Sequence, residues 1–274
     1  MNPHTRSLAV LSFFFVSAHS YGQVNTPTIG FARYSDQTVR RVMGVQAAAV
    51  VGDAVFNSVT ASSFSDKAGL LSVGGKIRLV LRNLSLVSEY DAAEPAALLS
   101  LEGDINTAVA WLPVHHSLLY WNGKSFSAVE VVDLATNRVT SLRRDGPNAA
   151  SLLLSTNDGK VLQASISLDT GNLRSLNLLP GVTAPAFAHR SDVIFRDSNG
   201  IEVLSSSGVL KTLPFTATDL VWERISSDWL HLASLNTGQN WILHLTGPVA
   251  QLSELPAPPQ ASASAASGSE GVRQ

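Results

Sequence analysis

Apolar residues along this chain come in short runs separated by clusters of turn-forming residues. Between Thr28 and Leu255 the runs are short and rich in Val, Leu, Ile and aromatic residues, whereas the clusters consist of Gly, Asn, Asp and Ser. This punctuation is typical of β-strands joined by tight turns. The best candidate for a helix, residues 85–102, is interrupted by Pro95. The pattern therefore predicts an all-β protein.

The turns recur at a regular spacing. Five segments combine an apolar strand, a glycine-containing turn and a second strand, with turn glycines at Gly75, Gly123, Gly159, Gly200 and Gly238. The step from each of these glycines to the next is roughly 40 residues, which is the length of a propeller blade. Glycine takes the positive φ that hairpin turns need, and further strand signals around each hairpin bring the count to four strands per unit. Four strands in each such unit are typical of a β-propeller blade.

We therefore expect a β-propeller of five or six four-stranded blades over residues 28–256. The five units fall at residues 45–103, 104–144, 145–182, 183–214 and 215–256. A hairpin at 28–43 precedes them, and six blades are favoured if it has its own place in the ring, because each blade buries its faces only against neighbouring blades. Two consecutive β-sandwich domains are the alternative, but they do not account for the repeated step between the turn glycines.

The turns of the repeat also carry a family resemblance. In three of the five turns the glycine is followed by lysine, at Lys76, Lys124 and Lys160. In blade rhythm and in these turns the whole repeat, residues 28–256, resembles the bacterial YVTN-type and tryptophan-aspartate repeat propellers. The resemblance implies a secreted bacterial β-propeller.

Both ends of the chain differ in composition from the repeat. Residues 1–20 have one charged side chain, Arg6, followed by an apolar stretch and small residues at Ala18 and Ser20, which is the order of a secretory signal peptide. We expect cleavage after Ser20, with Ala18 as second choice. Residues 257–274 are rich in Pro, Ala and Ser and predict a disordered tail. Because the chain has no cysteine, export without disulfides fits a bacterial periplasmic or secreted protein.

Composition narrows the classes of function. The net charge of −2 argues against nucleic acid as a partner, since phosphate binding needs clustered Lys and Arg. Apolar residues make up 45% of the chain and charged residues only 15%, yet no run is long enough to predict a membrane span. Strands packed between propeller blades need apolar residues on both faces, which explains the low share of charge.

Searches for catalytic and metal-binding motifs find no match. The chain has no Gly-x-Ser-x-Gly nucleophile elbow. Its nearest approach to a phosphate loop, residues 73–76, precedes a strand where such a loop precedes a helix. His115 and His116 are adjacent, and neighbouring strand residues point to opposite faces, so the pair is poorly placed to share a metal. We expect no catalytic residue, no metal and no cofactor.

Two kinds of residue remain as candidates for chemistry. A polysaccharide hydrolase or lyase needs two carboxylates about 5–10 Å apart, and for Asp145 and Glu223, each next to arginines, we expect ordinary surface ion pairs instead. Tryptophans either pack between blades or form stacking platforms for sugars and peptides. The five tryptophans are Trp111, Trp121, Trp222, Trp229 and Trp241.

These observations predict an exported binding or protein-interaction module, with an extracellular polysaccharide hydrolase or lyase on a propeller scaffold as the alternative. A third possibility is a docking part of an envelope assembly. We expect a protein or glycan partner to bind at one mouth of the central channel, where loops converge. The candidate ligand-binding residues are Asp104, Asn106, Arg144, Asp145, His189, Arg190 and Asp219.

Overall fold

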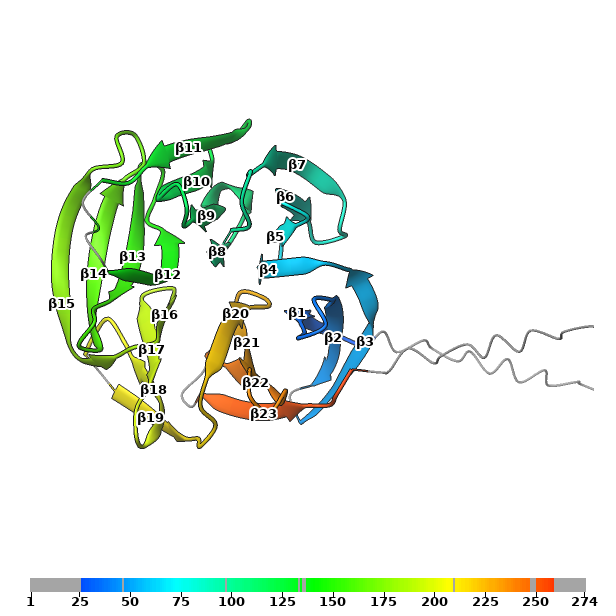
Figure 1. Ribbon diagram of the computed structural model, residues 1–274. Coiled ribbons are helices and arrows are strands. Elements are labelled where there is room, and N and C mark those ends of the chain that lie inside the picture. The colour runs from blue at the N-terminus through cyan, green and yellow to red at the C-terminus, as the bar shows by residue number, and fades with distance from the viewer. Residues whose placement is uncertain are drawn as a thin grey trace, which may run out of the picture.

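The computed structural model describes residues 26–258, except residues 46, 97, 133, 135, 136, 209 and 247–249. The described strands form six antiparallel sheets arranged around a central axis (Figure 1), which confirms the predicted all-β propeller and, of the five or six blades expected, shows six. The predicted signal peptide and almost all of the predicted tail lie outside the described residues. Within the described ranges, no helix is long and apolar enough to cross a membrane.

The first sheet has three strands and the other five have four, each in sequence order or its reverse. The first sheet contains β1 (Thr28–Arg33), β2 (Val39–Val45) and β3 (Ala48–Phe56). The second contains β4 (Val59–Phe64), β5 (Ala68–Val73), β6 (Lys76–Leu81) and β7 (Leu86–Asp91). The third contains β8 (Leu98–Ser100), β9 (Val109–Leu112), β10 (Ser117–Trp121) and β11 (Phe126–Glu130), with the short helix η1 (Ile105–Thr107) between β8 and β9.

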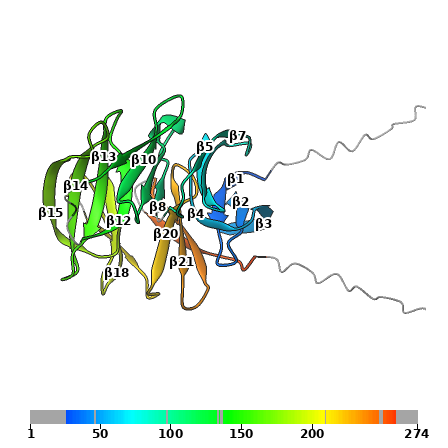
Figure 2. The same cartoon turned by 45° about the horizontal axis from the view of Figure 1, so that its top comes forward.

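The remaining three sheets are complete blades. The fourth contains β12 (Arg138–Arg144), β13 (Ala149–Ser155), β14 (Lys160–Ser167) and β15 (Leu173–Thr183). The fifth contains β16 (Ala186–His189), β17 (Asp192–Arg196), β18 (Gly200–Leu204) and β19 (Leu210–Pro214). The sixth contains β20 (Leu220–Arg224), β21 (Trp229–Ser234), β22 (Asn240–His244) and β23 (Gln251–Leu255). The inner strands β4, β8, β12 and β20 lie close to the axis (Figures 1 and 2).

The sheets are divided differently from the predicted units in the first half of the chain. The unit at 45–103 contains all of the second sheet, but also β3 of the first sheet and β8 of the third. The unit at 104–144 likewise includes β12, which belongs to the fourth sheet. The turn glycines mark the middle hairpin of four blades but the outer hairpin of the third sheet, where Gly123 lies between β10 and β11, and they do not show where the short inner strand begins. The last two units, 183–214 and 215–256, each contain one whole sheet.

The blades pack face to face, as the apolar runs require. Leu152, Leu153 and Leu154 on β13 point alternately to the two faces of their sheet, yet each is at most 1% exposed. Leu152 and Leu154 join a core cluster shared with the third sheet, whereas Leu153 joins one shared with the fifth. Burial on both faces is the reason that strands of this protein read as continuous apolar runs.

The ring closes between the first and sixth sheets. Residues from both ends of the described chain, among them Ile29, Val51, Ile225 and Leu255, form one buried cluster. The Phe31 amide donates to the Ile225 carbonyl over 3.1 Å, so β1 is tied to the segment that follows β20.

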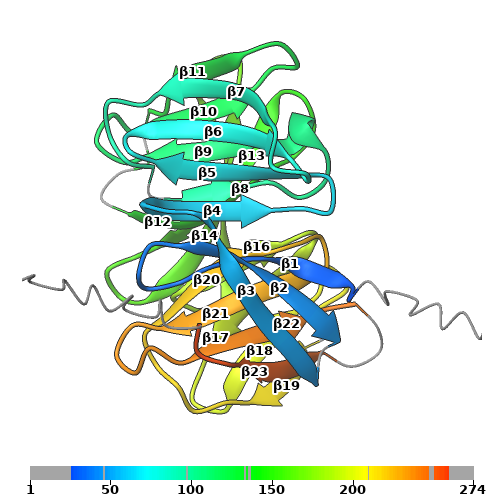
Figure 3. The same ribbon diagram turned by 90° about the vertical axis from the view of Figure 1, so that its right-hand side faces the viewer.

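The innermost strand of the first sheet runs in the opposite direction to the inner strands of the other sheets. The Gln37 carbonyl, after β1, accepts from the Val59 amide at the start of β4 (2.8 Å), while Arg82 donates to Thr28 at the start of β1 and pairs with Asp66 after the end of β4. Thus β1 runs antiparallel to β4, its neighbour on the axis (Figure 3). The three strands of the first sheet therefore have the directions of the second, third and fourth strands of a complete blade.

Candidate ligand-binding mouth

Two consecutive charged residues at the end of β20, Glu223 and Arg224, cross the channel in opposite directions. Glu223 lies 2.6 Å from Arg33 Nη2 of the first sheet and accepts from the Ser62 hydroxyl of the second sheet (3.0 Å). It is 8% exposed. Burial raises the pKa of Glu223, and the positive charge of Arg33 opposes that shift. We expected a surface ion pair here, and this expectation is wrong, because neighbouring strand residues point to opposite sides and both of these sides are covered by other blades.

Arg224 is the largest fully buried side chain in the described part of the protein. Its guanidinium lies 2.5 Å from Glu102 Oε1 and donates to the Ser100 hydroxyl (3.3 Å) and to the Ala188 carbonyl (3.2 Å). It also lies over the ring of Phe187 at 5.6 Å. One side chain thereby joins the sixth sheet to the third and the fifth. A buried ion pair of this kind is stable only when further hydrogen bonds satisfy both groups, and Arg224 has them.

Buried serines continue this network around the axis. Ser63 of β4 accepts from the Leu101 amide after β8 (3.0 Å), and Ser141 of β12 accepts from the Ala188 amide of β16 (2.9 Å). The inner strands are thus held by side-chain hydrogen bonds as well as by apolar contacts. Because these contacts cross the channel at the level of Arg224, we look for a ligand site at the mouth of the channel.

Charged residues surround one mouth of the channel, next to Arg224, at the end of the ring where β4, β8, β12, β16 and β20 end. The Arg190 amide donates to Glu102 Oε1 (3.2 Å), and its guanidinium pairs with Asp228. Arg143 Nε lies 2.9 Å from Asp145 Oδ1. Partial burial, and secondarily the negative charge of Glu102, raise the pKa of Asp145 against the opposing charge of Arg143. We define the charged mouth as Glu102, Arg143, Asp145, Arg190, Arg224 and Asp228.

Six of the seven predicted site residues lie at this end of the ring, but only Asp145 and Arg190 belong to the charged mouth. Arg144 is a clamp between the third and fourth sheets, since it donates to the carbonyls of Asn106 (2.6 Å) and Pro147 (2.7 Å) and also to that of Trp121. Asp104 accepts from the Asn106 amide (2.9 Å) and thereby caps η1. Through these contacts, Asp104, Asn106 and Arg144 stabilise the loops at the rim of the mouth.

His189 is buried beneath the mouth, with 2% of its surface exposed. Burial, and then the positive charges of Arg224 and Arg190, lower the pKa of His189 to about 2, so its imidazole is neutral. Arg224 Nη2 lies 3.4 Å from His189 Nδ1. Because a guanidinium only donates, Nδ1 accepts and Nε2 carries the hydrogen. A partner at the surface reaches Arg190, not His189.

Asp219 lies at the other end of the channel, because it precedes β20 whereas the charged mouth follows β20. Its carboxylate accepts from the Asn236 amide group and from the Thr218 hydroxyl. Asp219 is therefore separated from the other six predicted residues. All seven residues were expected at one mouth of the channel, and for Asp219 this expectation does not hold, because Asp219 precedes the inner strand and the other six lie at or after the end of one.

A groove of about 340 Å³ adjoins the charged mouth between the first and sixth sheets. Asp228 belongs to both the mouth and the groove. The groove combines the half-buried indole of Trp229, the carboxylates of Asp66 and Asp228, and the side chain of Val45, which is 62% exposed. Asp66 is also loosely paired with Arg82, at 3.6 Å. The lining residues are Pro27, Thr28, Ile29, Gly44, Val45, Asp66, Ser226, Asp228 and Trp229.

Sequence reasoning missed Glu102, Asp66, Asp228 and the central role of Arg224. A signal for Arg224 was present, because β20 reads LVWER and a charged pair at the end of an inner strand must find partners across the channel. Asp66 and Asp228 carry no comparable signal, since the groove depends on how the ring closes. Among the described residues, no group of three or more His, Asp or Glu side chains is placed to hold a metal ion.

Comparison with known proteins supplies no family. No family model matches the chain, and no curated protein matches it. Among solved structures, PorZ of Porphyromonas gingivalis is 11% identical with a TM-score of 0.47, covering 85% of this chain and 38% of PorZ. The β-propeller domain of Cps50 (Swd1) from Myceliophteria thermophila is 11% identical with a TM-score of 0.46, covering 83% and 89%. AztD of Citrobacter koseri is 12% identical with a TM-score of 0.42, covering 84% and 70%.

Proposed function

We propose that this protein is an exported binding module that docks a partner protein through the charged mouth and the adjoining groove. The observation that carries the proposal is the continuity of the two, with Asp228 shared between them. An accessible aromatic side chain beside exposed charges is the usual composition of an interface hot spot. Trp229 and Arg190 are the expected anchors, since Trp and Arg are enriched among residues that dominate binding energy.

The lining of the groove indicates the chemistry of the partner. Its charged side chains are the carboxylates Asp66 and Asp228, and its apolar surface comes from Val45 and Trp229. A basic side chain of the partner fits this combination, because its aliphatic stem covers apolar surface while its charged end meets a carboxylate. We therefore propose a partner segment that carries Lys or Arg next to apolar residues.

The alternative of a polysaccharide hydrolase or lyase is less well supported. Its two carboxylates would be Glu102 and Asp145, which interact electrostatically. However, Glu102 forms an ion pair with Arg224, and Asp145 forms one with Arg143. A glycosidase needs one carboxyl group free to give a proton to the leaving group, whereas each of these two carboxylates is held by an arginine.

Docking is tested by site-specific photo-crosslinking in cells of the source organism. A photo-reactive residue at Val45 should crosslink one defined partner protein, and the same residue at Leu178, an equally apolar and exposed position on β15, should not. The double substitution Asp66→Lys/Asp228→Lys should abolish the crosslink, while Asp169→Lys, an exposed position on the β14–β15 turn, should leave it unchanged. A crosslink that survives the double substitution, or the absence of any crosslink at Val45, would refute docking through the groove.

Export is tested separately. Fractionation should place the protein in the periplasm or the medium, and amino-terminal sequencing should find Tyr21 as the first residue. A cytoplasmic chain that begins at residue 1 would refute this part of the proposal.

A further inference from the structure

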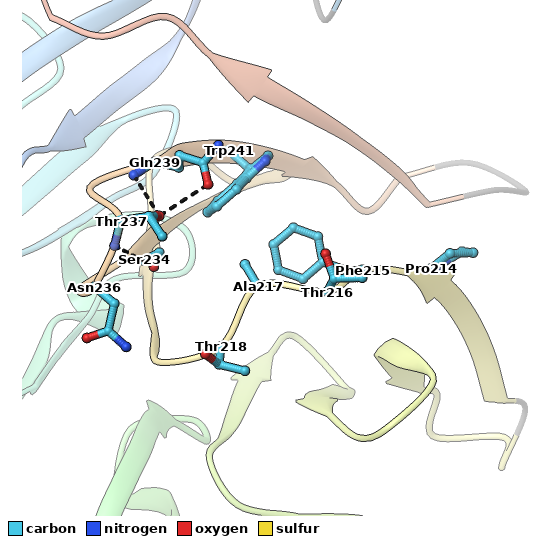
Figure 4. A pocket seen from close by; sticks show the side chains of 10 residues that line it. All are labelled: Pro214, Phe215, Thr216, Ala217, Thr218, Ser234, Asn236, Thr237, Gln239 and Trp241. Carbon is cyan, nitrogen blue, oxygen red and sulfur yellow. Dashed lines mark hydrogen bonds between the residues drawn. The ribbon is translucent and has the colours of Figure 1, made fainter.

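A second cavity, of about 580 Å³, lies between the fifth and sixth sheets at the end of the propeller opposite the charged mouth. Its walls are the linker from β19 to β20 and the turn between β21 and β22, with β22 behind them (Figure 4). The volume is within the range of about 300–1,000 Å³ typical of small-molecule sites. The lining residues are Pro214, Phe215, Thr216, Ala217, Thr218, Ser234, Asn236, Thr237, Gln239 and Trp241.

Two aromatic rings form the apolar part of the cavity. Phe215 and Trp241 pack edge to face, with centroids 5.0 Å apart and an angle of 89° between the rings. Trp241 is 8% exposed and is held in the core of the sixth sheet, whereas Phe215 is half-buried. The pair therefore provides a rigid wall whose more accessible face is the Phe215 ring.

The polar part of the cavity is formed entirely by uncharged side chains. Thr216, Thr218, Asn236, Thr237 and Gln239 are all exposed and supply hydroxyl and amide groups. In Figure 4, Thr237 and Gln239 lie toward one another on the β21–β22 turn, and Thr216 and Thr218 lie on the linker that carries Phe215. Hydroxyls and amides offer donors and acceptors together.

The charged neighbours of the cavity form hydrogen bonds with its lining residues. Asp219 accepts from Asn236 and Thr218, Glu254 accepts from the Gln239 side chain at 3.5 Å, and Arg196 donates to the Thr216 carbonyl at 3.2 Å. None of these three residues lines the cavity. A bound group would thus meet hydrogen-bonding side chains without a net charge.

The uncharged lining is specific to this cavity. A cavity of about 270 Å³ lies between the third and fourth sheets at the same end of the ring, with Trp111 of the third sheet in its wall. Its lining includes the guanidinium of Arg138 and the imidazole of His116. The propeller architecture by itself therefore does not produce a neutral, amide-rich lining.

We infer that the cavity between the fifth and sixth sheets binds an uncharged carbohydrate. A sugar ring presents C–H groups on its faces, which suit an aromatic wall, and hydroxyls around its edge, each able to donate and accept. The wall of Phe215 and Trp241 suits the C–H faces of the sugar, and the Thr, Asn and Gln side chains suit its hydroxyls. A charged ligand would find no counter-charge among the lining side chains, and a wholly apolar one would make no use of the hydroxyl and amide groups that line the cavity.

Isothermal titration calorimetry with defined oligosaccharides tests this site on the full-length mature chain. The neutral probes are the hexasaccharides of the maltose, cellulose, chitin, xylan and mannan series, and oligogalacturonate serves as the acidic probe, each up to 10 mM. At least one neutral probe should bind, and oligogalacturonate should not. The fluorescence of Trp241 should change with the same midpoint.

Two variants locate the binding. Gln239→Ala should raise the Kd of the bound probe about three- to tenfold, the effect of losing one hydrogen bond. Thr216→Trp, at an exposed position, should fill the cavity and raise the Kd by tenfold or more. The control Asn157→Ala, on the equivalent turn of the fourth sheet, should leave the Kd unchanged, as should Asp66→Lys/Asp228→Lys at the other end of the channel.

Three results would overturn the inference: no neutral probe binds at 10 mM, only oligogalacturonate binds, or the Kd is the same in the wild type and in both cavity variants. Loss of the partner crosslink at Val45 with intact oligosaccharide binding would instead refute only the proposed docking function.

Discussion

Substitution of Gly30 by alanine tests how the ring closes. Gly30 lies on β1 at its closest approach to the sixth sheet, and a Cβ added there would stand 2.1 Å from the Ile225 carbonyl oxygen and 2.6 Å from its carbon. Ordinary contacts of a Cβ begin near 3.4 Å, so β1 and the segment after β20 would have to move apart until 2.1 Å becomes 3.4 Å. Gly30 has no positive φ, so the obstacle is the neighbouring backbone alone.

The expected cost has two parts. Forcing extra atoms into a packed contact typically costs about 1–3 kcal/mol. The same separation breaks the 3.1 Å hydrogen bond from the Phe31 amide to Ile225, and a buried amide left without a partner costs about 1–3 kcal/mol more. We therefore expect Gly30→Ala to lower the free energy of unfolding by about 2–6 kcal/mol, the sum of the two parts. For a domain of this size, that loss lowers the Tm by roughly 5–20 °C.

The assay is thermal and urea unfolding followed by circular dichroism and tryptophan fluorescence. Gly103→Ala is the matched control, because its Cβ would meet only the Thr107 methyl group at 3.8 Å. It should be neutral or stabilising by up to about 1 kcal/mol, the usual benefit of replacing glycine where the backbone permits it. If Gly30→Ala unfolds within about 0.5 kcal/mol of the wild type, the range of an ordinary surface substitution, β1 does not close the ring by the contact described.

Two further predictions concern buried ionisable residues, namely the ion pair of Arg224 in the channel and the two buried histidines, His189 of β16 and His231 of β21. Arg224→Ala should destabilise the protein by about 3–5 kcal/mol, since it leaves Glu102 without its ion-pair partner. The double substitution Arg224→Met/Glu102→Leu should recover part of that loss in the same unfolding assay. Equal stability of Arg224→Ala and the wild type would contradict the role given to the ion pair. Burial lowers the pKa of His231 to about 4, as it lowers that of His189 to about 2. Below about pH 6.5 the unfolded chain therefore binds protons at these histidines that the folded protein does not bind. As the pH decreases from 7 to 5, the free energy of unfolding should decrease by about 2 kcal/mol per histidine. Urea unfolding at both pH values checks the slope, which should be about halved in His231→Gln; a flat profile in the wild type would contradict it.

Much of the architecture follows from the sequence. Apolar runs on both faces and turn glycines such as Gly75, Gly123 and Gly159 predicted strands, blade length and a ring, because these features reflect local conformation and the burial of whole sheets. The division into blades followed less well. The inner strand β8 (Leu98–Ser100) is too short to show a pattern of its own, and the direction of β1 depends on contacts with β4, which follows only after two intervening strands.

The candidate site could be predicted only in part. The sequence analysis expected a ligand site at one mouth of the channel, and of the seven residues named for it, Asp145 and Arg190 lie in the charged mouth. The roles of the residues were not predictable, because Arg144 and Asp104 bond backbone groups brought near by folding, and Arg224 finds Glu102 across the channel. Which charges face solvent depends on packing between blades that are distant in sequence, and no periodicity along the chain records it.

The contact between Gly30 and Ile225 also constrains the order of folding. The two partners lie near opposite ends of the repeat, and bringing distant segments together is entropically costly and slow. Until the sixth sheet is in place, the apolar side chains of Ile29 and Val51 on the first sheet remain uncovered. An incomplete propeller is thus an open arc with an apolar face at each end, which exposes it to association with other copies.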